Sequence, residues 1–179
     1  MKPLINGKLI DSQLTAAIKD SDQLAFKDLF YKYYPKLFRY AVVHVRSKET
    51  ASDLVEEVFF RVWEKREKLN PQKSIQAYLY KILNNLIINH HKLASSKNVS
   101  LEYELQRNAF EANTTLDNQI DLNLALEKLP NKLRSVFVLI KVDGFKYDET
   151  AKICGISVKA VEKRMTKVLS LLKKFFSQV

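Results

Sequence analysis

The fold class of this 179-residue chain is indicated most clearly by one stretch, residues 51–63, which read ASDLVEEVFFRVW. Its apolar residues recur three and four positions apart, and on an α-helix this spacing places them on one face. A half-buried strand would instead alternate at every second residue. The stretch therefore predicts an amphipathic helix over about 49–69. Its inward positions are Leu54, Val55, Val58, Phe59, Val62 and Trp63.

The same spacing continues on both sides of this helix. We expect one helix over 22–33 and, opened by Pro35, a second helix over 36–46. Asn70-Pro71 interrupts the pattern, and Ser74 is placed to cap a further helix that carries an apolar stripe. The first half of the chain is thus predicted to be a four-helix domain.

Helical periodicity fails after about residue 94 and resumes at residue 120. We interpret residues 96–118 as a flexible linker between a domain over 1–95 and a domain over 119–179. The predicted fold class is all-α, with two small helical domains.

The second domain has the order of a helix-turn-helix motif. An apolar helix, bent or restarted at Pro130, ends at Asp143-Gly144. A short helix over 148–154 follows, then Gly155, and then a long basic helix that reaches about residue 176.

Several classes of function are disfavoured by composition. The chain has only three glycines and neither a GxxxxGK[ST] nor a GxGxxG loop, so no phosphate-binding loop is expected. His90 and His91 are adjacent and point in different directions on a helix, so they cannot chelate as an i, i+4 pair. Cys154 is the single cysteine, which fits a reducing compartment. We expect no catalytic residue, no metal, no cofactor and no small-molecule substrate.

The sequence contains no apolar run of the length that a membrane span needs and no recognisable signal peptide. We therefore expect a cytoplasmic protein without direct membrane insertion.

Positive charge is concentrated in the two predicted domains. The net charge of +10 divides into +6 over residues 1–95, −2 over 96–119 and +6 over 120–179. Residues 68–101 contain no acid at all, and they combine lysines with aromatic rings and amides. Cations bind phosphates, rings stack on bases and amides read base edges, so this segment is a candidate surface for single-stranded nucleic acid. The alternative interpretation is that Tyr78 belongs to the hydrophobic core and that the amides are ordinary surface groups.

Five stretches together resemble a known family. They are residues 51–63 (ASDLVEEVFFRVW), 77–82 (AYLYKI), 129–137 (LPNKLRSVF), 144–151 (GFKYDETA) and 155–161 (GISVKAV). The first two are similar to region two, and the last three to region four, of extracytoplasmic-function (ECF) sigma factors of the sigma-70 family. The resemblance implies an alternative sigma factor that binds core RNA polymerase, recognises the −10 and −35 promoter elements and promotes DNA melting.

The resemblance also implies a role for each of three groups of residues. Asp53, Leu54, Glu56, Glu57 and Phe60 match the surface that docks on the β′ coiled coil of core polymerase. The −10 element is expected to contact Tyr78, Tyr80, Lys81, Asn84 and Asn85. The −35 element is expected to contact Lys159, Glu162, Lys163, Arg164 and Lys167. Further implied partners are the polymerase β flap and an anti-sigma factor.

Two residues depart from the family pattern. Glu162 lies where many relatives have Arg or Lys, and its carboxylate suits a cytosine amine better than a phosphate. Lys146 lies where relatives often have a capping Ser or Thr, so the cap of that helix is weak or is supplied by another group.

Other functions remain open at this stage. A one-component helix-turn-helix regulator would bind DNA without polymerase. A small nuclease would need clustered carboxylates beside the basic groove, and the acid-free segment argues against it. A pure protein adaptor leaves both basic domains unexplained.

Overall fold

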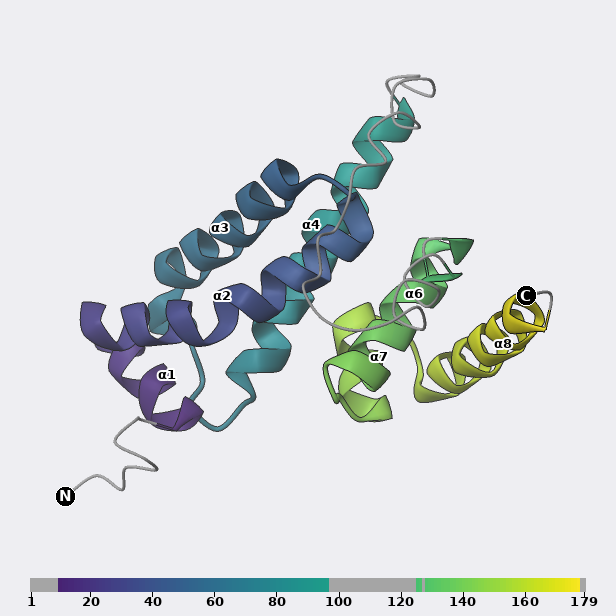
Figure 1. Cartoon of the computed structure of the whole chain (residues 1–179). Helices are drawn as coiled ribbons and strands as arrows, with labels where there is room; N and C mark the ends of the chain where they lie inside the picture. Colours follow the sequence, from purple (N-terminus) through teal and green to yellow (C-terminus); the bar gives the residue numbers. More distant parts are fainter. Residues whose placement is uncertain (1–9, 97–124, 127, 178–179) are drawn as a thin grey trace, which may run out of the picture.

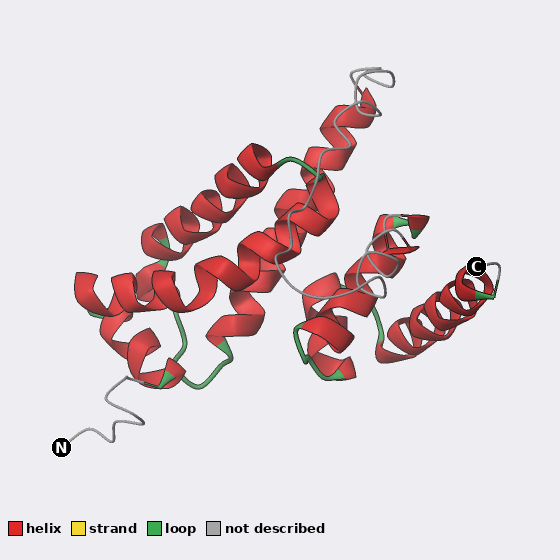
Figure 2. Cartoon of the chain, viewed as in Figure 1, coloured by secondary structure: helices red, strands yellow, loops and turns green. Residues whose placement is uncertain are grey.

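The computed structural model of the chain describes residues 10–96, 125–126 and 128–177, and every regular element in this part is helical (Figure 2). The all-α prediction is confirmed. The predicted linker, apart from Ser96, lies outside the described residues. The elements are α1 (Asp11–Lys19), α2 (Gln23–Val45), α3 (Lys48–Glu64), η1 (Arg66–Lys68), α4 (Ile75–Ser96), α6 (Asn131–Phe137), η2 (Val138–Val142), α7 (Tyr147–Cys154) and α8 (Val158–Phe176).

Helix α2 is one continuous helix, so the prediction of two helices divided at Pro35 was wrong. A proline inside a helix removes one backbone hydrogen bond, which here would have been accepted by the carbonyl of Tyr31. Tyr31 is exposed, so water can donate a hydrogen bond to that carbonyl instead. The buried stripe runs past the proline from Tyr33 to Leu37 without a change of face, and its burial outweighs the lost hydrogen bond.

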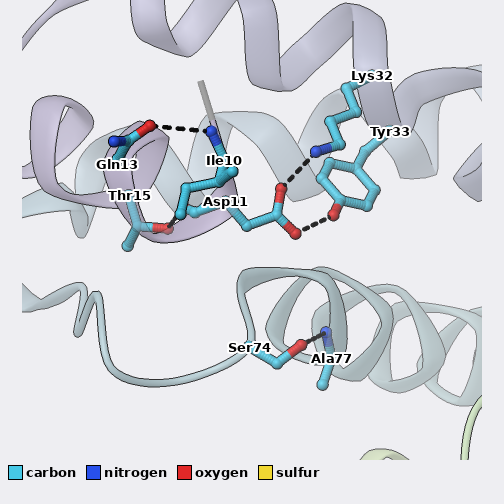
Figure 3. A network of polar contacts seen from close by, with 8 residues as sticks. All are labelled: Ile10, Asp11, Gln13, Thr15, Lys32, Tyr33, Ser74 and Ala77. Atoms are coloured by element: carbon cyan, nitrogen blue, oxygen red, sulfur yellow. Dashed lines mark hydrogen bonds and ion pairs between the residues drawn. The ribbon is translucent and has the colours of Figure 1, made fainter. Parts of the chain in front are cut away.

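Helix α1 was not predicted, because nine residues are too few to show a helical repeat of apolar positions. Leu14 and Ile18 are buried against the α1–α4 bundle. The Asp11 carboxylate accepts hydrogen bonds from Lys32 Nζ at 2.8 Å and from the Tyr33 hydroxyl (Figure 3). These contacts fix α1 on α2, and burial together with the Asp11 carboxylate raises the pKa of Tyr33 well above its ordinary value.

Helix α3 is held on α2 by aromatic side chains. The rings of Phe26 and Trp63 lie 4.9 Å apart between centroids, and those of Phe30 and Phe59 lie 4.7 Å apart. Such pairs stabilise a packed interface by about 0.5–1.5 kcal/mol beyond their buried area. The opposite side of α3 is therefore presented to solvent in a fixed orientation.

The helix that starts after Pro130 ends in a π turn, η2, that the sequence did not reveal. The Asp143 amide donates to the Val138 carbonyl at 2.9 Å, and the Phe145 amide donates to the Leu139 carbonyl at 2.9 Å. Gly144 lies between them at a φ of 75°, a left-handed conformation that a side chain disfavours. The predicted end at Asp143-Gly144 is confirmed.

The helix-turn-helix is formed by α7, a turn at Gly155 with a φ of 65°, and α8. Ser157 caps α8, since its Oγ accepts from the Ala160 amide at 3.2 Å. The Glu149 carboxylate caps α7 by accepting from the Lys146 amide at 2.9 Å. Glu149 thus satisfies the amide of the N-cap residue Lys146, but Lys146 makes no side-chain cap of the kind that a Ser or Thr would supply to the first-turn amides.

The two helical groups are in contact. Helix α7 packs on α4, and α6 packs on α2 (Figure 1). Helix α8 lies on the far side of α7 from the α1–α4 bundle (Figure 1). The sequence predicted two domains but did not predict this contact.

Candidate polymerase and nucleic-acid interfaces

The exposed side of α3 combines acidic and apolar groups. Asp53, Glu56 and Phe60 are exposed, and 57% of the Phe60 surface is open to solvent. Leu54 and Glu57 are half-buried beside them. All five residues predicted to dock on polymerase are therefore accessible on one helix. An exposed phenylalanine one helical turn from two carboxylates, on a protein of net charge +10, is typical of a protein-binding surface.

Two of these carboxylates are held in place by neighbours one helical turn away. Arg61 Nε donates to Glu57 at 2.6 Å, and the Ser52 hydroxyl donates to Glu56 at 3.2 Å. Ser52 is itself 2.9 Å from the Tyr34 hydroxyl on α2. The acidic groups therefore keep a defined position on α3.

The predicted −10 residues separate into two groups. Lys81 and Asn85 are exposed, and Tyr78 is half-buried beside them, three and four positions apart on one face of α4. This face joins a cation, an amide and a ring, as contact with an unstacked base and its phosphates requires. Ser74 Oγ accepts from the Ala77 amide at 3.1 Å and fixes the start of the helix (Figure 3).

Tyr80 and Asn84 do not lie on that face, which corrects their prediction as −10 contacts. Asn84 is 4% exposed, and its Oδ1 accepts from the buried Tyr40 hydroxyl at 3.1 Å. Tyr80 is fully buried between Tyr40 and Phe145, which is a residue of the second domain. The sequence prediction assigned all five residues to the −10 element, whereas the helix distributes them over two sides.

Helix α8 presents the predicted −35 residues to solvent. Lys159, Glu162, Lys163 and Lys167 are exposed, and Arg164 is half-buried. Between α8 and α6 lies an open groove of about 360 Å³ that contains four cationic side chains and no carboxylate. The groove is lined by Pro130, Lys132, Leu133, Ala160, Lys163, Arg164 and Lys167.

Lys132 is the functional candidate that sequence reasoning missed on this face. It belongs to α6 rather than to the helix-turn-helix, and only the packing of α6 on α8 brings it to the groove. The sequence analysis identified the stretch 129–137 as a motif but did not predict that this stretch packs beside α8.

No nucleophile or metal site is evident in the described residues. Burial raises the pKa of the Cys154 thiol to about 11, so the thiolate is scarce at neutral pH. Within the described ranges, no group of three or more His, Cys, Asp or Glu side chains could hold a metal ion.

Comparison with known protein families identifies both halves of the chain. The family model for Sigma-70 region 2 matches residues 29–96, and that for Sigma-70, region 4 matches residues 119–172. These intervals include α4 and the part of α8 that carries the predicted DNA contacts. The chain belongs to the sigma-70 family and, within it, to the ECF subfamily. It is an alternative sigma factor that acts with RNA polymerase.

Individual relatives agree with this assignment. The chain is 26% identical over 140 residues to the ECF RNA polymerase sigma factor EcfG of Rhodopseudomonas palustris, which covers 77% of each chain. It is 26% identical over 161 residues to the sigma factor YlaC of Bacillus subtilis, covering 84% of this chain and 91% of that protein.

Solved structures show the same fold. CnrH was determined in complex with the cytosolic domain of CnrY. It superposes on this chain with a TM-score of 0.71 at 22% identity, and the superposition covers 94% of this chain and 97% of the CnrH chain. RpoE from Bartonella quintana, determined in complex with the anti-sigma factor NepR, also has a TM-score of 0.71, at 23% identity, and covers 85% of this chain and 96% of its own.

Among the described helices, none combines the length and the apolar character required to cross a membrane.

Proposed function

We propose that the α3 face of Asp53, Glu56, Glu57 and Phe60, with Leu54 beneath it, is the surface by which this sigma factor docks on core RNA polymerase. One observation carries this proposal: a basic protein exposes a large aromatic side chain, Phe60, one helical turn from the carboxylates of Glu56 and Glu57. Long-range attraction between this face and a basic partner would raise the association rate, and the desolvated ring would supply affinity.

The exposed faces of α4 and α8 supply the DNA contacts in this proposal. Tyr78, Lys81 and Asn85 contact the −10 element, where a base unpairs and is held against the ring and the amide. The cations of α8, with Lys132 from α6, hold the phosphates around the −35 element, while Glu162 faces a base.

The remaining parts of the proposal follow from the same family. The protein works in the cytoplasm as a DNA-binding regulator without a catalytic step of its own. The relative RpoE was solved with an anti-sigma factor, which supports an anti-sigma factor as a partner of this chain as well.

Charge reversal on α3 tests the polymerase surface. Glu56→Lys combined with Glu57→Lys should abolish co-elution of the protein with core polymerase, because two attractive charges become repulsive beside the anchoring ring. Glu67→Lys, an exposed change outside α3, is the matched control and should co-elute normally.

Helical content from circular dichroism should be the same in all three proteins, since the altered side chains lie at the surface. Unchanged co-elution of the double variant would remove α3 as the docking surface.

A further inference from the structure

The acid Glu56 on the exposed face of α3 is connected through hydroxyl groups to α2, which lies beside α3 (Figure 1). The Ser52 hydroxyl donates to Glu56 Oε1 at 3.2 Å, and the Tyr34 hydroxyl lies 2.9 Å from Ser52 Oγ. A serine hydroxyl has one proton, so a Ser52 that donates to Glu56 accepts from Tyr34. The three side chains therefore form a directed relay, Tyr34 to Ser52 to Glu56, in which each donor polarises the next.

The first member of this relay is fixed by aromatic packing. The Tyr34 side chain is half-buried, and its ring contacts Phe30 at a centroid distance of 4.9 Å and Phe38 at 6.0 Å, with an angle of 10° to the Phe38 ring. Phe30 in turn packs on Phe59 of α3. The Tyr34 hydroxyl is thus held at one place on the α2–α3 interface, and it gives the Ser52 hydroxyl a fixed partner.

The two glutamates of the α3 face differ in the group that holds them. Glu57 accepts from Arg61 Nε at 2.6 Å, so a cation of the same helix already balances its charge. Glu56 is held by a neutral hydroxyl, and the ion pairs found in the described part of the chain do not include it. Its charge is therefore ordered but not neutralised. Such a carboxylate suits a cation on a partner, because the relay has already removed part of the side-chain freedom that binding would remove.

We propose that Tyr34 and Ser52 are positioning residues, which pre-order Glu56 to receive an arginine or lysine side chain of core polymerase. This inference rests on the docking function proposed above and extends it to a residue of α2. Phe60 lies one helical turn beyond Glu56, so the ordered carboxylate is next to the exposed ring that supplies affinity. Glu56 contributes more to the affinity than Glu57, whose charge must first leave Arg61.

Removal of single hydroxyl groups from the full chain tests the relay. Tyr34→Phe keeps the packed ring, Ser52→Ala removes the middle group, and each should weaken the affinity for core polymerase about fivefold. Neither variant changes the charge of the face, so the loss should lie in faster dissociation at an unchanged association rate. Ser52→Thr keeps a hydroxyl and should retain most of the affinity. Tyr31→Phe, which removes an exposed hydroxyl of α2 outside the relay, is the matched control.

A double-mutant comparison separates positioning from a purely structural role. Glu56→Ala should weaken the affinity about tenfold, and Glu57→Ala should weaken it less. In the Glu56→Ala background, Tyr34→Phe should cause no further loss, because no carboxylate remains to be positioned. Equal losses in both backgrounds would overturn the proposal, since a hydroxyl that only supports the packing of α2 on α3 acts whether or not Glu56 is present. A larger loss in Glu57→Ala than in Glu56→Ala would overturn the assignment of Glu56 as the dominant acid.

The same series distinguishes failure of the relay from failure of the docking surface. If Glu56→Ala and Phe60→Ala both bind polymerase with the parental affinity, α3 is not the docking surface, and the proposed function fails together with the relay. If both bind weakly while Tyr34→Phe and Ser52→Ala bind as the parent does, the docking surface stands and the relay is overturned.

Discussion

Asn84 and Asn85 are neighbours in the sequence and have opposite environments in the structure. Asn84 lies in the interior and accepts from the Tyr40 hydroxyl, whereas Asn85 points to solvent on the face with Tyr78 and Lys81. A step of one residue turns a helix by about 100°, which is enough to move an amide from the core to the DNA-facing surface.

This difference predicts a separation of stability from promoter opening. Asn84→Ala removes the Asn84 acceptor of the buried Tyr40 hydroxyl and should lower the free energy of unfolding by roughly 1–3 kcal/mol, measured by urea denaturation. Asn85→Ala should change stability by less than about 0.5 kcal/mol but reduce open-complex formation on duplex promoters. A template already mismatched over the −10 element should recover part of that loss. Equal defects of Asn85→Ala on both templates would contradict a role in base capture.

His44 is a second residue whose behaviour depends on its surroundings. Burial lowers its pKa from 6.5 to about 4, although a hydrogen bond from Nδ1 to the Tyr40 carbonyl opposes the change, and nearby Arg134 and His91 lower it further. The folded protein therefore binds fewer protons at His44 than the unfolded chain does. Stability is complete above pH 6.5 and is lost as pH falls from 6.5 towards 4.

Between pH 7.5 and pH 5, this linkage should cost about 2 kcal/mol of unfolding free energy. His44→Gln should make the loss smaller, whereas His90→Gln, half-buried on α4, should act only through His91, whose pKa the His90 charge helps to lower. His91 has a lowered pKa as well and adds to the loss in every variant. Urea unfolding at the two pH values measures the loss of unfolding free energy. If His44→Gln loses as much unfolding free energy as the parent protein, the pH dependence belongs to other groups.

At the scale of elements, the α6–α8 pair makes the basic groove, and neither helix makes it alone. Lys132 comes from α6, while Lys163, Arg164 and Lys167 come from α8. Glu162 lies next to this groove on the exposed side of α8, and none of the ion pairs among the described residues includes it. An ion pair between Glu162 and Lys159, one helical turn away, is thus not seen among the described residues.

Substitutions at this groove are expected to have two different effects on binding to the −35 element. Lys132→Ala and Lys163→Ala should each weaken binding to all −35 sequences and flatten its salt dependence by about one charge. Glu162→Ala should instead change which base is preferred at one position, by roughly 1–3 kcal/mol. Lys173→Ala, on α8 but outside the groove lining, is the control. Selection from randomised −35 sequences, with binding measured over a range of salt concentrations, separates the two classes, and an unchanged preference would leave Glu162 as a surface charge.

For the whole molecule, Arg134 joins parts of the chain that are far apart in the sequence. Its guanidinium is buried and donates to the carbonyls of Leu126, Leu129 and Val43 at 2.7, 2.9 and 2.9 Å. Val43 lies in the last turn of α2, where free carbonyls give the helix end a partial negative charge. The cation is thus compensated by backbone groups of both domains.

Arg134→Ala should therefore lower the free energy of unfolding by roughly 3 kcal/mol or more, because three buried carbonyls lose a charged donor. Lys132→Ala, two residues away and exposed, should leave the unfolding midpoint nearly unchanged. Urea denaturation followed by circular dichroism measures both. A small effect of Arg134→Ala would mean that water replaces the guanidinium at these carbonyls.

The sequence by itself determined the all-α class, most of the long helices and the family. Apolar spacing in 51–63 and along α8 marked the buried faces, because a helix repeats every 3.6 residues wherever it packs. Ser74, Ser157 and Gly155 marked helix ends through local hydrogen bonds and backbone conformation. These features depend on residues that are close in the sequence, and they can therefore be predicted without knowledge of the fold.

The tertiary structure decided the features that depend on distant contacts. Continuity of α2 through Pro35 required the buried stripe on both sides of the proline. The burial of Tyr80 required Phe145 from the other domain, and the groove required α6 to lie on α8. Side chains that meet only after packing leave no periodic signal, so the sequence could propose the DNA-facing helices but not which of their residues are free to contact DNA.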